Sequence, residues 1–76
     1  MNKQQLYFKI KANRETIRSN RLVIEDIKKS LQIVSDTSQK VALIKKSNEL
    51  NTLNVAILAE NEVLTKDYST ILSYSK

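Results

Sequence analysis

The chain has 76 residues and a net charge of +5, and it contains no glycine, proline, cysteine or histidine. A domain this small, folding alone, buries only about 60 % of the surface that it exposes when unfolded. The missing cysteine and histidine exclude disulfides and structural zinc as extra sources of stability. We therefore expect an all-α chain that depends on helix packing and association.

The amino-terminal segment MNKQQLYFKIKANRE has no apolar core and no small-residue cleavage site, so it does not have the form of a signal peptide. The longest apolar run, residues 55–59, has five residues. A membrane span needs about 20 consecutive apolar residues. We expect a cytoplasmic protein with no membrane span.

The first predicted helix covers about residues 4–34. Its inward positions alternate in spacings of four and three residues, which is the heptad pattern of a coiled coil. In heptad order the a and d positions are Leu6, Ile10, Asn13, Ile17, Asn20, Ile24, Ile27, Leu31 and Val34. Asn13 and Asn20 thus occupy d positions, where an apolar residue is usual.

A turn is predicted over residues 35–39, SDTSQ, where several poor helix formers cluster. Asp36 or Thr37 is suited to cap a new helix, and Asp36 with Gln39 has the form of a capping box. The heptad pattern also breaks here, because its continuation would place polar residues at the a positions. We therefore expect a chain reversal.

The second predicted helix covers about residues 40–74. One seam repeats every seven residues and a companion row follows four residues later; together they contain Leu43, Ser47, Leu50, Asn54, Ile57, Asn61, Leu64, Tyr68, Ile71 and Ser75. A short connection makes two helices antiparallel neighbours. We predict that residues 1–76 form a single domain, an antiparallel two-helix hairpin of the coiled-coil type.

The seams also predict a register for the hairpin. Folding the chain about residue 37 gives the facing pairs Ile17 with Ile57, Ile24 with Leu50, Asn13 with Asn61 and Asn20 with Asn54. A buried amide without a partner costs about 1–3 kcal/mol, whereas two facing amides donate to and accept from each other. We predict that the asparagine pairs fix the register. The alternative is that these positions lie at a periphery reached by water.

Many apolar residues lie outside both seams, above all in LNTLNVAILA, residues 50–59. A helix that is apolar on most sides is normally buried against more than one neighbour. We therefore expect self-association, most simply two hairpins forming a four-helix bundle, or docking onto another protein.

The sequence offers no candidate catalytic residue, metal ligand or cofactor site. Histidine and cysteine are absent, the eight carboxylates are dispersed, and a phosphate-binding loop needs glycine. We predict that the protein is not an enzyme.

The positive charge is concentrated in the first half of the chain. Residues 1–34 hold eight basic and three acidic residues, whereas residues 35–76 hold five of each. A row along the first helix contains Lys11, Arg14, Arg18, Arg21 and Lys28. Such a row suits nucleic-acid phosphates, with Tyr7 and Phe8 available for stacking on bases, but it also suits the solvation of an exposed helix face.

We expect a small interaction module that self-associates and binds a partner protein, as an adaptor, a chaperone or an inhibitor does. Small proteins of this composition are common among accessory proteins of phages and plasmids. A dimeric RNA- or DNA-binding protein is the alternative. The candidate partner contacts are Tyr7, Phe8, Lys11, Arg14, Arg18, Arg21, Leu53 and Leu58.

Overall fold

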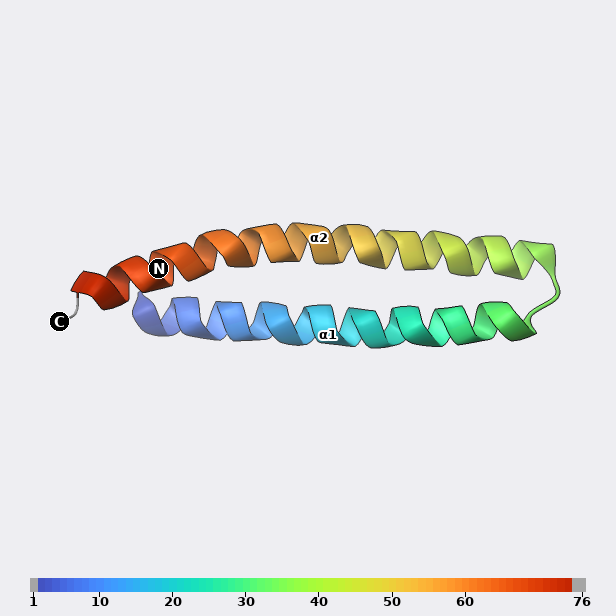
Figure 1. The fold of residues 1–76 in the computed structure, drawn as a ribbon, viewed down its shortest axis with the longest axis horizontal. Helices are drawn as coiled ribbons and strands as arrows, with labels where there is room; N and C mark the ends of the chain where they lie inside the picture. The colour runs from blue at the N-terminus through green and yellow to red at the C-terminus, as the bar shows by residue number, and fades with distance from the viewer. Residues whose placement is uncertain (1, 75–76) are drawn as a thin grey trace.

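The computed structural model describes residues 2–74, which form two helices (Figure 1). Helix α1 spans Lys3–Ile33 and helix α2 spans Thr37–Tyr74. The two helices run antiparallel and side by side, and the hairpin measures 59 × 14 × 14 Å. The predicted all-α two-helix hairpin is confirmed.

Helix α1 begins with a capping box that the sequence analysis did not identify. The side-chain oxygen of Asn2 accepts a hydrogen bond from the backbone amide of Gln5 at 2.8 Å, and the side-chain oxygen of Gln5 accepts one from the backbone amide of Asn2 at 3.0 Å. These bonds satisfy amides that have no partner within the first turn of a helix. The helix accordingly starts one residue before the predicted boundary.

The connection between the helices is shorter than the predicted turn, because α2 already begins at Thr37. Asp36 Oδ1 accepts a hydrogen bond from the Ser38 amide at 2.9 Å, and the Asp36 carbonyl accepts one from the Lys40 amide at 3.0 Å. Asp36 is therefore the N-cap of α2. Thr37 and Ser38, which are poor helix formers, stand in the first turn, where the cap offsets their low propensity.

The core of the hairpin is a single seam whose buried apolar residues all come from α1. These residues are 2–8 % exposed and comprise Leu6, Ile10, Ile17, Ile24 and Ile27. The apolar seam residues of α2 are half-buried: Leu43, Leu50, Ile57, Leu64 and Ile71. Ser75, the last predicted seam position, lies outside the described residues. The core is thin, and it leaves most of the α2 surface outside the interface.

Within residues 2–74, neither helix has a stretch apolar enough to cross a membrane.

Candidate partner-binding surfaces

The middle of the interface contains a buried asparagine pair. Asn13 Nδ2 donates a hydrogen bond to Asn61 Oδ1 at 2.7 Å, and Asn61 Nδ2 donates one to the Ile10 carbonyl at 3.3 Å. Asn13 is 7 % exposed and Asn61 is 8 % exposed. Each amide therefore exchanges its bonds with water for bonds within the interface.

A second asparagine pair lies two helical turns nearer the connection. Asn20 Nδ2 donates a hydrogen bond to Asn54 Oδ1 at 2.9 Å. Asn54 is buried and Asn20 is half-buried, so this pair is closer to solvent than the first. The apolar seam residues around both pairs lie in the same interface: Ile17 and Ile24 are buried, and Leu50 and Ile57 are half-buried.

Heptad positions divide the rest of the surface into two sides. In an antiparallel pair, the e positions of both helices flank the seam on one side and the g positions flank it on the other. The e side contains Tyr7, Arg14, Arg21 and Lys28 of α1 and Ile44, Asn51, Leu58, Thr65 and Leu72 of α2. The g side contains Lys9, Thr16, Val23 and Ser30 of α1 and Lys46, Leu53, Glu60 and Asp67 of α2.

A groove follows the junction of the helices on the e side. One hollow is lined by Arg14, Ile17, Val55, Leu58, Ala59, Asn61, Glu62, Thr65 and Lys66. A second hollow is lined by Tyr7, Ile10, Lys11, Arg14, Thr65 and Tyr68. Arg14 and Thr65 line both hollows, which therefore join into one groove. We call it the e-side groove.

The aromatic residues lie at the terminal end of the e-side groove. The Tyr7 ring is 6.3 Å from the Tyr68 ring across the hairpin, and it is 5.7 Å from the Phe8 ring in an edge-to-face arrangement. The Tyr7 ring therefore contacts Tyr68 of α2 on one side and Phe8, its neighbour in α1, on the other. Phe8 stands one position further out, on the outer face of α1.

The g side has a different character, because it carries an ion pair between the helices. Lys9 Nζ lies 3.8 Å from Glu60 Oε1, and both side chains are about half exposed. Leu53 belongs to this side. The structure therefore separates Leu53 from Arg14 and Leu58, with which the sequence analysis had grouped it.

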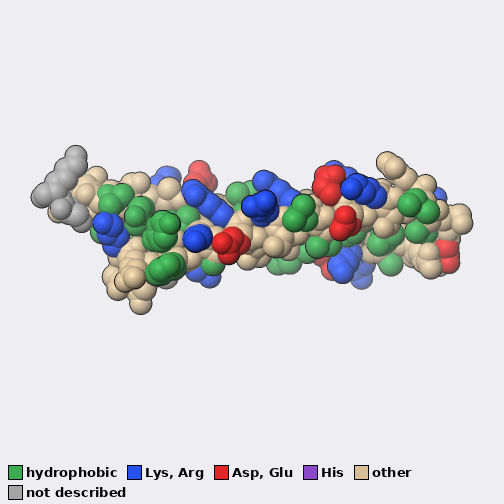
Figure 2. Space-filling model, turned by 90° about the horizontal axis from the view of Figure 1, so that it is seen from below, with side chains coloured by type: hydrophobic (Ala, Val, Ile, Leu, Met, Phe, Trp, Pro, Cys, Tyr) green, Lys and Arg blue, Asp and Glu red, His purple; other side chains and the backbone are tan. Residues whose placement is uncertain are grey.

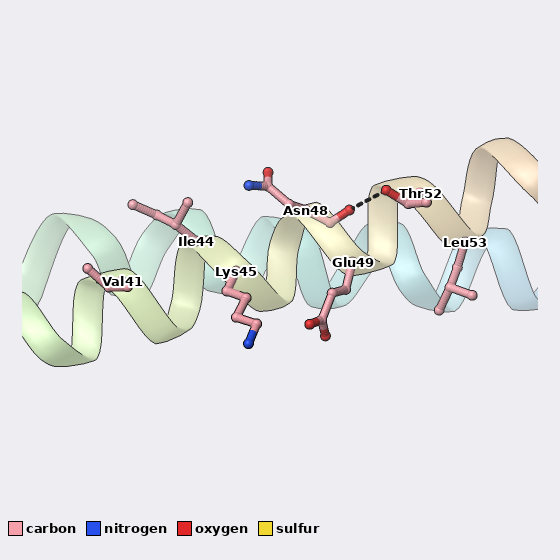
Figure 3. Close-up of a pocket in the computed structure, with 7 residues that line it drawn as sticks. All are labelled: Val41, Ile44, Lys45, Asn48, Glu49, Thr52 and Leu53. Atoms are coloured by element: carbon pink, nitrogen blue, oxygen red, sulfur yellow. Dashed lines mark hydrogen bonds between the residues drawn. The ribbon is translucent and has the colours of Figure 1, made fainter.

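A shallow hollow on the outer face of α2 lies between the two sides (Figure 3). It is lined by Val41, Ile44, Lys45, Asn48, Glu49, Thr52 and Leu53. Ile44 and Leu53 point away from each other, toward opposite sides of the helix (Figure 3). Thr52 Oγ1 donates a hydrogen bond to the Asn48 carbonyl at 3.0 Å. Since only α2 lines this hollow, it is an apolar surface of one helix and not a cleft.

All eight candidate contact residues are exposed. Figure 2, seen from the α1 side, shows lysine and arginine side chains along most of the hairpin, with carboxylates between them. The structure brings Tyr7, Lys11, Arg14 and Leu58 together along the e-side groove. Arg21 follows Arg14 by one heptad on the same side. Arg18 occupies the adjoining b position.

Of an apolar stripe on the outer surface of α2, part of which lines the e-side groove, the predicted partner contacts included only Leu58. Its members are 40–67 % exposed and comprise Val41, Ile44, Val55, Leu58 and Leu72. We call them the α2 outer stripe. They occupy e and b positions, which recur at spacings of three and four residues. Polar residues such as Asn48 and Asn51 interrupt this pattern, so it does not stand out beside the stronger inner seam.

Among residues 2–74, no three carboxylates gather into a group that could hold a metal ion. Comparisons of the chain with protein-family models, curated proteins and solved structures find no match.

Proposed function

We propose that the hairpin is a non-enzymatic interaction module that binds a partner protein through the α2 outer stripe, as an adaptor, a chaperone or an inhibitor does. The observation that carries this proposal is the exposure of apolar side chains along α2. Val55 is 67 % exposed and Leu58 is 47 % exposed, although both line the e-side groove. Apolar patches of this kind on a small protein are typical of interaction sites.

The energetics support the same proposal. Completing the burial of a half-exposed valine or leucine contributes about 1 kcal/mol. The five residues of the α2 outer stripe would together contribute several kcal/mol to a complex. The hairpin core, with five buried apolar residues, has little stability to spare, so binding would also stabilise the fold.

Capture from an extract of the native host tests this proposal. The immobilised chain is compared with a stripe variant, Val55→Ser with Leu58→Gln, and bound proteins are quantified by mass spectrometry. The control variant, Leu22→Ser with Ile33→Gln, removes exposed apolar side chains from the outer surface of α1. We expect the stripe variant to lose proteins that the control variant retains. Equal capture by both variants would contradict the proposal.

Nucleic-acid binding is the second candidate, and the basic row of α1 favours it. Within the described residues, Arg14, Arg18 and Arg21 form no ion pair, so their charges are available to phosphates. Affinity for duplex RNA or DNA would then fall steeply with salt. Each replacement of an arginine by alanine would reduce the slope of log affinity against log salt concentration by about 1. A mobility-shift assay without binding at low salt would remove this candidate.

A further inference from the structure

We infer that the e side of the hairpin binds an acidic amphipathic helix of the partner protein. This inference rests on the proposed function and specifies the chemistry of the partner. It follows from the e side having an apolar surface on α2 next to a basic surface on α1.

The apolar half of the e side belongs to α2. Val55 and Leu58 line the groove, and Ile44 and Leu72 occupy e positions of the same helix two heptads before and after Leu58. Val55 and Leu58 stand three residues apart, which is one of the spacings at which a partner helix presents apolar residues. A partner helix lying along the groove would therefore contact the α2 outer stripe with one apolar face.

The basic half of the e side belongs to α1. The e and b positions of the two helices hold five basic residues and two acidic ones: Lys11, Arg14, Arg18, Arg21, Lys28, Glu25 and Glu62. Glu25 already forms an ion pair with Lys28 at 3.5 Å, and Glu62 lines the same hollow as Arg14 and Lys66. In the part of the chain that the structure describes, neither Arg14 nor Arg21 forms an ion pair, so both can pair with carboxylates of a partner.

A second copy of the chain does not fit this side. In a twofold dimer the e side of one hairpin would pack against the e side of the other, and this is possible in two orientations. One orientation places the arginines of α1 against those of the other α1. The other orientation places them on the apolar stripe of the other α2. The first brings like charges together and the second buries charge against apolar side chains, and both are unfavourable.

A nucleic acid fits only half of the e side. Phosphates would bind Arg14 and Arg21, but they would leave Val55 and Leu58 against a highly charged backbone. An amphipathic helix with carboxylates along one edge covers both halves. Its apolar face packs on the stripe, and its carboxylates accept hydrogen bonds from the guanidinium groups.

Two synthetic peptides test the inference with the full-length chain. Both are amphipathic helices of about three heptads with the same apolar positions, but one carries glutamates at the flanking positions and the other carries lysines. Binding is measured by fluorescence anisotropy at low salt. We expect the acidic peptide to bind at least about tenfold more tightly than the basic peptide.

Charge reversal identifies the residues that recognise the peptide. In the variant Arg14→Glu with Arg21→Glu, we expect the preference to reverse, so that the basic peptide binds more tightly. The control variant, Lys29→Glu with Lys46→Glu, makes the same change in net charge outside the e and b positions and should keep the original preference. These two results together would show that the peptide preference depends on the position of the positive charge and not on the net charge of the chain.

Four results would overturn the inference: absence of binding by the acidic peptide, equal binding of the two peptides, tighter arginine-dependent binding of duplex RNA, or a dimer that the stripe variant dissociates. The proposed function fails separately. If mutation of the stripe abolishes capture of host proteins but the two peptides bind equally, the proposed interaction module stands and the acidic helix is rejected as its partner. Unchanged capture would reject the module itself.

Discussion

At the scale of single residues, the two asparagine pairs are the polar bonds that join the helices inside the seam. The Asn13–Asn61 bond is 2.7 Å long and buried, and the Asn20–Asn54 bond is 2.9 Å long and partly exposed. A shift by one heptad would keep only one asparagine pair, and it would place Asn61 opposite Leu6 or Asn54 opposite Ile27, depending on its direction. The register in the structure is the one in which each asparagine has a polar partner.

A double-mutant cycle tests the coupling between Asn13 and Asn61. Replacing either residue alone with leucine leaves the other amide without its partner, and we expect each single variant to lose about 1–3 kcal/mol of unfolding free energy. The double variant restores an apolar seam, so its loss should be smaller than the sum of the two, with a coupling of about 0.5–3 kcal/mol. Urea denaturation followed by circular dichroism measures all four proteins.

The matched cycle on Asn20 and Asn54 is the control for this experiment. Because Asn20 is half-buried, water replaces part of the lost bond, and the coupling should be weaker. Additive effects in the Asn13–Asn61 cycle would mean that the pair does not contribute to the choice of register.

At the scale of the helices, the connection depends on Asp36 as the N-cap of α2. We expect Asp36→Ala to lower the unfolding free energy by about 1 kcal/mol, because the Ser38 amide loses its acceptor. Asp36→Asn keeps a side-chain oxygen in the same place, so it should cost only a few tenths of a kcal/mol. Urea denaturation distinguishes the two variants, and an equal loss in both would contradict the role of the cap.

The helices and their register could be predicted from the sequence because both seams are periodic over the whole chain. Asn13 and Asn61 could be paired by their residue numbers alone. The start of α2 was predicted less well. Asp36 was one of two predicted caps, but Thr37 and Ser38 have the composition of a turn, so the helix was expected only from about residue 40, whereas it begins at Thr37 with Asp36 as its cap.

The candidate binding surface was less predictable, because the heptad pattern defines the inside of the hairpin more clearly than its sides. Leu53 and Leu58 are both exposed leucines of α2, and nothing in their local sequence separates them. Packing against α1 places Leu58 beside Arg14 in one groove and leaves Leu53 on the side of the Lys9–Glu60 ion pair. The α2 outer stripe becomes recognisable once the inner seam is known.

At the scale of the whole molecule, self-association remains a prediction of the sequence. A hairpin with one thin seam leaves apolar residues on both sides, including Val23 and Leu53 on the g side. We expect light scattering at micromolar concentration to give a mass above the 8.7 kDa of one chain. Arg14→Glu should leave that mass unchanged, because the e side does not fit its own copy. A mass of 8.7 kDa would contradict self-association.

Titration of the ¹⁵N-labelled chain with the acidic helical peptide, followed by nuclear magnetic resonance, tests most directly whether the e side is the docking surface. We expect the largest shifts in the backbone amides of Val55 and Leu58 and in the side-chain Nε–H signals of Arg14 and Arg21. Signals of Lys9, Lys46 and Leu53 should change little. Shifts concentrated on the g side, or spread evenly over both helices, would contradict docking on the e side.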